Sequence, residues 1–246
     1  MADKMAHDFN YGISQALIPY YSHVHKFGEN ASVGTSLESL WSETGLYVYP
    51  SSATVMTLSS DDANDAAAGT GAQKIMVEGE IADFVLASEE VTLNGTSGVN
   101  TSNSYLRINR LYNTDVGSGE VNDGNVYIGT GTITAGKPAT VYGKIDAGKG
   151  QTLQAIYTVP AGYKAYLRRP YFSSGKGKDV QFDLFMRTDG EGFRIIHVGK
   201  TYESPYGNNF EVPIELPEKT DIEIRVISDA ASTAVAGGFE VCLIEQ

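Results

Sequence analysis

The sequence predicts an all-β protein, an antiparallel β-sandwich or jelly roll with an extended N-terminal arm and enough length for two β domains. Three observations carry this prediction. Short runs with apolar side chains at every second position recur along the chain, and turn dipeptides such as Asn94-Gly95 separate them. No stretch of ten to twelve residues shows a helical apolar stripe. The chain also has 27 glycines and 15 tyrosines, which suit turns and half-buried strands.

Residues 1–40 differ from the rest and are predicted to form the arm. Residues 13–21 are apolar and aromatic, and a proline inside them interrupts any helix. An arm of this kind packs either on its own domain or on a neighbouring subunit. The side chains expected to make its assembly contacts are Ile18, Pro19, Tyr20, Tyr21, His25 and Phe27.

Residues 41–147 are predicted to form an acidic β domain. Residues 39–49 suggest the first firm strand, with Trp41 as a core anchor, and residues 74–80 and 84–93 suggest a hairpin. Residues 105–111 alternate, but neither face is purely apolar. That pattern favours an edge strand or a contact between subunits.

Residues 148–246 are predicted to form a β-sandwich or jelly-roll domain, separated from the first by a break near residues 148–150. Strands are expected over residues 151–160, 163–169, 180–187, 193–198, 222–226 and 238–244. In residues 222–226 the apolar side chains fall on one face and the charged ones on the other, which is the period of a strand.

The charge balance argues against a nucleic-acid partner, since the net charge is −12 and the pI about 4.7. Residues 1–130 hold 5 Lys and Arg against 16 Asp and Glu, a net of −11, so the excess lies in the first half. The N-terminus lacks the apolar run of a secretory signal, and no stretch is long enough to span a membrane. Synthesis in the cytoplasm is therefore expected, and the single cysteine, Cys242, excludes a disulfide within the chain.

No motif selects a catalytic, cofactor or metal site, so we predict a protein that is not an enzyme and needs no cofactor. His23 and His25 would share a strand face but lack the further ligands that zinc requires. The acidic residues Asp61, Asp62 and Asp65 could bind Ca²⁺ weakly through oxygen ligands, although their spacing matches no known calcium loop.

Residues 151–163 (QTLQAIYTVPAGY) resemble a segment of virion structural proteins of tailed bacteriophages, many of them from marine samples. Five further stretches resemble the same proteins in the same order: residues 24–28, 41–52, 69–79, 91–96 and 216–222. The resemblance covers most of the chain. It implies a component of the capsid surface, the head–tail junction or the tail, and it supplies no catalytic residues.

The resulting expectation is a structural protein of the virion, made in the host cytoplasm. It would be a capsid decoration (cement) protein that stabilises the head, as a homotrimer bound to the major capsid protein or to other virion proteins. A head–tail connector, collar or tail accessory protein is the alternative within this class. A carbohydrate-binding module for host attachment is the alternative of another class, with Tyr112, Tyr171, Tyr202 or Tyr206 stacking on sugars.

Overall fold

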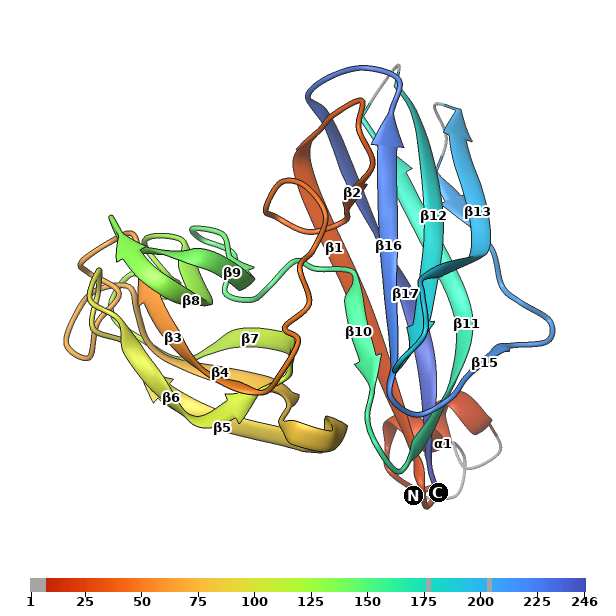
Figure 1. Cartoon of the computed structure of the whole chain (residues 1–246), viewed down its shortest axis with the longest axis horizontal. Helices are drawn as coiled ribbons and strands as arrows, with labels where there is room; N and C mark the ends of the chain where they lie inside the picture. The colour runs from red at the N-terminus through yellow and green to blue at the C-terminus, as the bar shows by residue number, and fades with distance from the viewer. Residues whose placement is uncertain (1–7, 176–177, 203–204) are drawn as a thin grey trace.

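The chain forms two β-sandwiches, one of which is inserted into the other (Figure 1). The computed structural model describes residues 8–175, 178–202 and 205–246. We call residues 54–145 the inserted sandwich. The main sandwich is built from residues 21–39 and 156–245, on either side of the insertion. The predicted all-β class is confirmed, because every sheet is antiparallel and helical structure in the described residues is confined to two short segments, α1 (Phe9–Ser14) and the 3-10 turn η1 (Ala82–Phe84).

The main sandwich consists of two five-stranded sheets. The first has the order β1 (Tyr21–Val33), β17 (Thr233–Glu245), β11 (Tyr163–Ser174) and β14 (Tyr206–Gly207), with β15 (Ile214–Leu216) also on β11. The second has the order β10 (Ile156–Val159), β16 (Thr220–Ser228), β12 (Asp179–Thr188) and β13 (Arg194–Tyr202), with β2 (Glu38–Ser39) also on β16. The stacked rings of Phe172 and Phe182, 4.2 Å apart, join the two sheets through the core.

The inserted sandwich is smaller and has its own core. One sheet has the order β6 (Val99–Tyr105), β3 (Thr54–Ser60), β8 (Val126–Thr134) and β9 (Lys137–Ile145). The other has the order β5 (Leu86–Thr92), β4 (Ala72–Glu80) and β7 (Arg107–Val116). The predicted hairpin over residues 74–93 is present as the β4–β5 pair. Fully buried aliphatic side chains such as Leu58, Ile75 and Leu111 fill the space between these sheets.

The two segments that connect the sandwiches lie side by side. The amide of Ala155 donates to the carbonyl of Leu40 at 2.9 Å, and Trp41 and Gln154 form an antiparallel bridge. Trp41 is buried against Tyr47 at this junction, as a core anchor should be. However, only Ser39 of the strand predicted over residues 39–49 lies in a strand, as the second residue of β2, and the rest of that stretch is a loop with a single bridge at Trp41.

The structure corrects the arm predicted for residues 1–40. Residues 21–33 are β1, an integral edge strand of the main sandwich that pairs with β17 from Tyr21 and Ile244 to Asn30 and Val235. The strand was not predicted because its side chains are mostly polar, and its partner lies more than 200 residues away. What stands apart from the sheets is residues 8–20, which we call the N-terminal segment; residues 1–7 lie outside the described residues. Among the described residues, no helix is long and apolar enough to cross a membrane.

Candidate functional site

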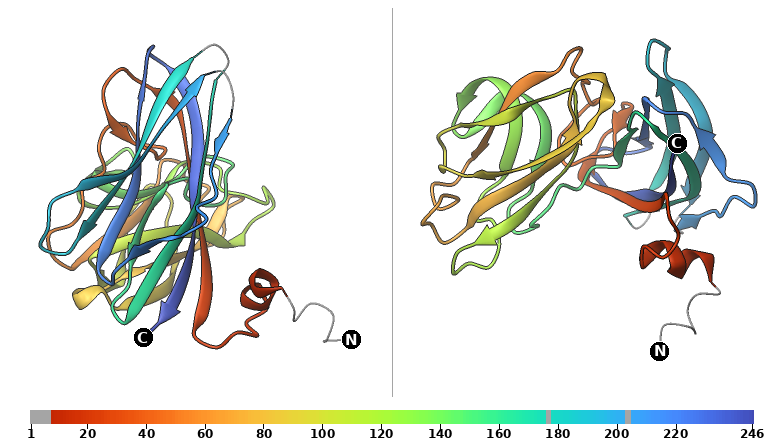
Figure 2. Two further views of the ribbon diagram at one scale, coloured as in Figure 1. Left: turned by 90° about the vertical axis from the view of Figure 1, so that its right-hand side faces the viewer. Right: turned by 90° about the horizontal axis from the view of Figure 1, so that it is seen from below.

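The N-terminal segment stands off the foot of the main sandwich, beside the end of β17 (Figures 1 and 2). Asp8 caps α1, because its carboxylate accepts the amide of Asn10 at 2.9 Å. Ile13 is buried, and the ring of Phe9 meets that of Tyr21 edge to face at 5.4 Å. The N-terminal segment is therefore packed against the main sandwich, and the contact between Phe9 and Tyr21 connects it to β1.

The outer surface of this segment is apolar. Its large side chains are exposed by about half or more: Phe9 51%, Tyr11 56%, Leu17 55% and Tyr20 72%. Four exposed side chains of this kind within twelve residues are a candidate surface for a partner, because covering them would remove apolar area from water. We call these four residues the apolar foot.

The six side chains predicted to make assembly contacts divide into two groups. Ile18 packs against Gly12, and Pro19 and Tyr20 are exposed, so these three lie in the N-terminal segment. Tyr21, His25 and Phe27 lie on β1, where their odd-numbered positions put them on one face of the strand. Three residues of the apolar foot, Phe9, Tyr11 and Leu17, were missed. The apolar run over residues 13–21 was the signal that could have included Leu17.

His25 is engaged inside its own subunit. Its Nε2 lies 2.6 Å from the hydroxyl of Tyr171 on β11, and its ring also contacts Phe27. Burial lowers the pKa of His25 below its ordinary value of 6.5, partly offset by the carboxylate of Glu240. A lowered pKa in the folded state means that the unfolded chain binds more protons as the pH falls, so this contribution to stability is present above pH 6.5 and is lost in acid.

We therefore expect the free energy of unfolding to decrease between pH 6.5 and pH 5, and to decrease less in the His25→Gln variant. The difference should be under about 1 kcal/mol, because the ring is partly exposed. Urea denaturation at several pH values measures it. His23→Gln is the matched control, on the same face of β1; equal slopes for the His25 variant and the wild type would contradict the assignment.

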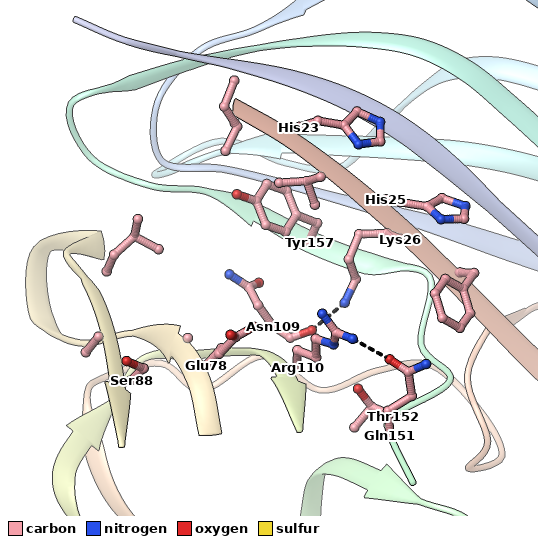
Figure 3. A pocket seen from close by; sticks show the side chains of 16 residues that line it. His23, His25, Lys26, Glu78, Ser88, Asn109, Arg110, Gln151, Thr152 and Tyr157 are labelled. Carbon is pink, nitrogen blue, oxygen red and sulfur yellow. Dashed lines mark hydrogen bonds between the residues drawn. The ribbon is translucent and has the colours of Figure 1, made fainter. Parts of the chain in front are cut away.

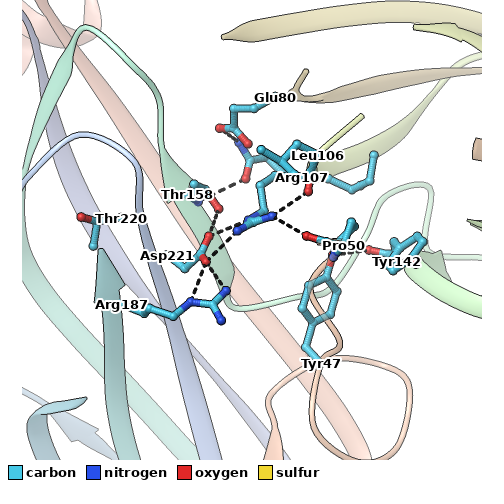
Figure 4. Close-up of polar contacts among 12 residues, drawn as sticks. Tyr47, Pro50, Glu80, Leu106, Arg107, Tyr142, Thr158, Arg187, Thr220 and Asp221 are labelled. Carbon is cyan, nitrogen blue, oxygen red and sulfur yellow. Dashed lines mark hydrogen bonds and ion pairs between the residues drawn. The ribbon is translucent and has the colours of Figure 1, made fainter. Parts of the chain in front are cut away.

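A buried ion cluster joins the two sandwiches (Figure 4). Asp221 of β16 accepts from Arg107 of β7, with Nε to Oδ1 at 2.7 Å and Nη2 to Oδ2 at 3.0 Å. The same carboxylate accepts the hydroxyl of Thr158 at 2.7 Å and the guanidinium of Arg187 at 2.5 Å. Asp221 and Arg107 are 2% and 6% exposed, so water screens this cluster little. These bonds fix how the sandwiches meet.

Aromatic rings cover the same cluster. The Arg107 guanidinium lies 5.1 Å from the centres of both the Tyr49 and Phe84 rings, and Arg187 lies 4.7 Å from Tyr49. The mixed faces of residues 105–111 predicted an edge strand or a contact between subunits, and β7 is indeed the edge strand of its sheet. Arg107 and its neighbours face the main sandwich of the same chain.

A cleft of about 510 Å³ opens between β1 of the main sandwich and β4, β5 and β7 of the inserted one (Figure 3). Apolar side chains such as Val24, Leu86 and Tyr157 line part of it. At its inner end the amine of Lys26 donates to the main-chain oxygen of Asn109. Arg110, at the rim, donates to the side chain of Gln151 at 2.7 Å.

Two ionisable side chains next to this cleft, Glu80 and Lys26, are unusually well buried for their residue types. Glu80 is fully buried and Lys26 is 7% exposed. Burial raises the pKa of Glu80 to about 8, although its hydrogen bond from Asn109 and the positive charge of Arg107 oppose the shift. Burial likewise lowers the pKa of Lys26 to about 7, with Arg110 acting in the same direction. A polar group with a perturbed pKa in a cleft is the pattern of a functional site.

The acidic residues considered for calcium organise loops of the inserted sandwich. Asp65 is fully buried and accepts four hydrogen bonds, from the hydroxyl of Ser60 and from the amides of Ala72, Asp123 and Gly124, at 2.6 to 2.9 Å. Across residues 8–175, 178–202 and 205–246, no three His, Cys, Asp or Glu side chains gather in a way that could hold a metal ion.

The tyrosines considered for sugar stacking do not gather on one surface. Tyr112 belongs to the inserted sandwich, whereas Tyr171, Tyr202 and Tyr206 belong to the main one. Two of them use their hydroxyls within the subunit, Tyr171 with His25 and Tyr206 with His197. Tyr202 is the one of these four that is largely exposed, at 65%, and the amine of Lys200 lies 5.3 Å from the centre of its ring.

Comparison with known proteins gives distant structural neighbours only. No protein-family profile and no curated protein matches the sequence. Among solved structures, the chain is similar to that of infectious bursal disease virus Gt strain, at 10% identity over 96% of this chain and 78% of that one, with a TM-score of 0.24. A mutant VP2 protein of the same virus, from derived T=1 particles, is 10% identical over 98% and 76% of the two chains, with a TM-score of 0.25. These weak neighbours are viral capsid proteins, and the function has to be argued from the chain itself.

Proposed function

We propose that this protein is a non-enzymatic structural component of a tailed-phage virion, a decoration protein that stabilises the head. The apolar foot carries the proposal. A chain with a net charge of −12 and two complete cores nevertheless exposes four large apolar side chains on one short segment. A partner that covers them removes this apolar surface from water, which favours association.

The placement of the apolar foot supports an orientation on the particle. It lies at one end of the main sandwich, while the inserted sandwich stands to the side (Figure 1). With the foot on the major capsid protein, both sandwiches project outward, and the acidic first half of the chain faces solvent. The resemblance of residues 151–163 and 41–52 to phage virion proteins supports the same assignment.

The rigid junction between the sandwiches fits a structural role. A decoration protein stabilises a shell by holding surfaces at fixed positions, and the Arg107–Asp221 cluster fixes one sandwich on the other. We expect a homotrimer. In a trimer three apolar feet would bind the capsid together, and the overall binding would be tighter than that of a single foot.

Copy number separates this role from the alternative within the virion. Quantitative mass spectrometry of purified virions should find the chain at a stoichiometry comparable with the major capsid protein. A stoichiometry of about six or twelve copies per particle would instead identify a head–tail connector, collar or tail accessory protein and overturn the decoration role.

The contact itself is tested with a variant of the apolar foot. Replacing Tyr11, Leu17 and Tyr20 by serine, with Phe9 kept because its ring holds the segment on Tyr21, should reduce incorporation into virions at least about tenfold and leave the unfolding temperature of the free protein nearly unchanged, because these three side chains are exposed. Val55→Ser is the control, since Val55 is 44% exposed but lies on β3 of the inserted sandwich. Normal incorporation of the serine variant would refute the proposed contact.

A further inference from the structure

Three buried polar side chains from both sandwiches lie close to one another beside the cleft: Figure 3 labels Lys26 and Asn109, and Figure 4 labels Glu80. Lys26 comes from β1 of the main sandwich, and Glu80 and Asn109 come from β4 and β7 of the inserted sandwich. The lysine amine donates to the main-chain oxygen of Asn109, and the Asn109 side-chain amide donates to Glu80 Oε1 at 2.7 Å. Their exposures are 7%, 0% and 8% for Lys26, Glu80 and Asn109, so water has little access to any of them.

The carboxamide of Asn109 is held at both ends. Its Nδ2 is bound to Glu80, and its Oδ1 accepts the main-chain amide of Thr158 at 3.3 Å. A backbone N–H directed at a carbonyl oxygen stabilises the negative charge that develops there when a nucleophile adds to the carbon. The carboxamide is thus oriented and polarised, which is the arrangement of an electrophile.

Glu80 is placed to move a proton. Its Oε1 contacts the nitrogen that would leave from Asn109, and its Oε2 is buried without a hydrogen-bond partner. With a pKa raised by burial to about 8, this carboxyl group is mostly protonated at neutral pH. An acid beside the leaving nitrogen can supply the proton with which it departs.

Lys26 meets the requirement for a nucleophile, because an amine attacks only in its neutral form. With a pKa lowered by burial to about 7, a large part of this amine is neutral at neutral pH. Arg110 opposes its protonation, whereas Glu78 and Glu80 favour it. The amine already contacts the main-chain oxygen of the residue that bears the carboxamide, and the attack requires the lysine side chain to turn its amine from that oxygen to Cγ of Asn109.

We propose that Lys26 and Asn109 are joined by an intramolecular isopeptide bond that forms without any other protein. The lysine Nζ adds to Cγ of Asn109, the bond between Cγ and Nδ2 breaks, and ammonia leaves. Glu80 protonates the departing nitrogen and takes up the proton that Nζ loses, so it ends as it began. The reaction exchanges one amide for another, and it requires neither an oxidant nor a cofactor.

The surroundings favour the product. Burial of the three side chains protects the new amide from hydrolysis, and the adjoining cleft, which both Lys26 and Asn109 line, gives ammonia a path to solvent. The bond would link β1 of the main sandwich to β7 of the inserted one and so fix the junction covalently. It does not depend on the proposed role in a virion, and its test needs no particle.

Mass spectrometry of the full chain, denatured after incubation at neutral pH, tests the bond. Loss of ammonia lowers the mass of the 26.4 kDa chain by about 17 Da. Trypsin should then leave Lys26 uncut, with the tripeptide of residues 108–110 attached to it. The full sequence mass, with ordinary cleavage at Lys26, would overturn the proposal, and this measurement needs no variant.

Two variants assign the roles. Lys26→Met and Glu80→Gln should each retain the full mass of their own sequences, the first for lack of the amine and the second for lack of the acid. Lys149→Met is the matched control. Lys149 also contacts β1, through an ion pair with Glu29 at 3.4 Å, but its side chain is 48% exposed and its partner is a carboxylate. It should show the loss of about 17 Da as the wild type does. A cross-link that persists in Glu80→Gln would refute the role of Glu80.

Discussion

The Asp221→Ala variant is expected to lose about 3–5 kcal/mol of stability, the largest effect of any single change at the junction. The substitution removes the carboxylate and leaves the guanidinium of Arg107, which is 6% exposed, buried without its anion. The hydroxyl of Thr158 and the guanidinium of Arg187 lose their acceptor as well. Most of the loss is therefore the cost of an unpaired buried charge.

Because this cluster lies between the sandwiches, its loss should also allow the two sandwiches to unfold at different urea concentrations. Urea denaturation followed by tryptophan fluorescence, with Trp41 at the junction, and by circular dichroism should give coincident curves for the wild type and separated curves for the variant. Lys74→Ala is the control, as the Lys74–Glu90 pair is 40% exposed on both sides and should therefore change the stability little. If both variants unfold like the wild type, the cluster does not join the sandwiches.

The Asp65→Ala variant is expected to lose roughly 3–5 kcal/mol as well, for a different reason. It removes the acceptor of three main-chain amides, those of Ala72, Asp123 and Gly124, which then stay buried without partners. Since these amides belong to two separate segments, the start of β4 and the loop before β8, both should loosen together. Amide hydrogen exchange should show faster exchange in residues 70–72 and 122–125, while the main sandwich remains protected.

Asp62→Ala is the matched control for that change. Asp62 lies three residues before Asp65 in the same acidic run and is partly exposed. Its carboxylate accepts a hydrogen bond from the nearby main-chain amide of Asn64, at 2.8 Å. We expect it to cost under about 1 kcal/mol. A comparable loss from both substitutions would indicate that the charge of the run, not the buried hydrogen bonds of Asp65, stabilises these loops.

The sequence predicted the parts of the fold that are local. The alternation in residues 222–226 and 180–187 corresponds to β16 and β12, and the turn-bounded run over 74–93 corresponds to the β4–β5 hairpin. Such strands have one face in a core, so the period of two is visible in the residues themselves. In contrast, β1 carries His23, His25 and Lys26, and its assignment depends on pairing with β17 at the other end of the chain.

The junction could not be predicted for the same reason. Arg107 and Asp221 are 114 positions apart, and each alone is typical of an exposed strand position. The mixed faces of residues 105–111 predicted an edge strand or a contact between subunits, and β7 is an edge strand, but nothing local indicates that Arg107 packs on a second sandwich of the same chain. Likewise Lys26, Glu80 and Asn109 carry no spacing signal, because three strands from two sandwiches bring them together.

The bridge between Trp41 and Gln154 has a consequence for how this architecture can vary. The chain leaves the main sandwich and returns to it at adjacent points, so the intervening residues form a module with a single place of attachment. A host whose entry and exit are neighbours can accept a shorter, longer or unrelated module without rethreading its own sheets. The strand order of the main sandwich is thus independent of what stands between residues 41 and 154.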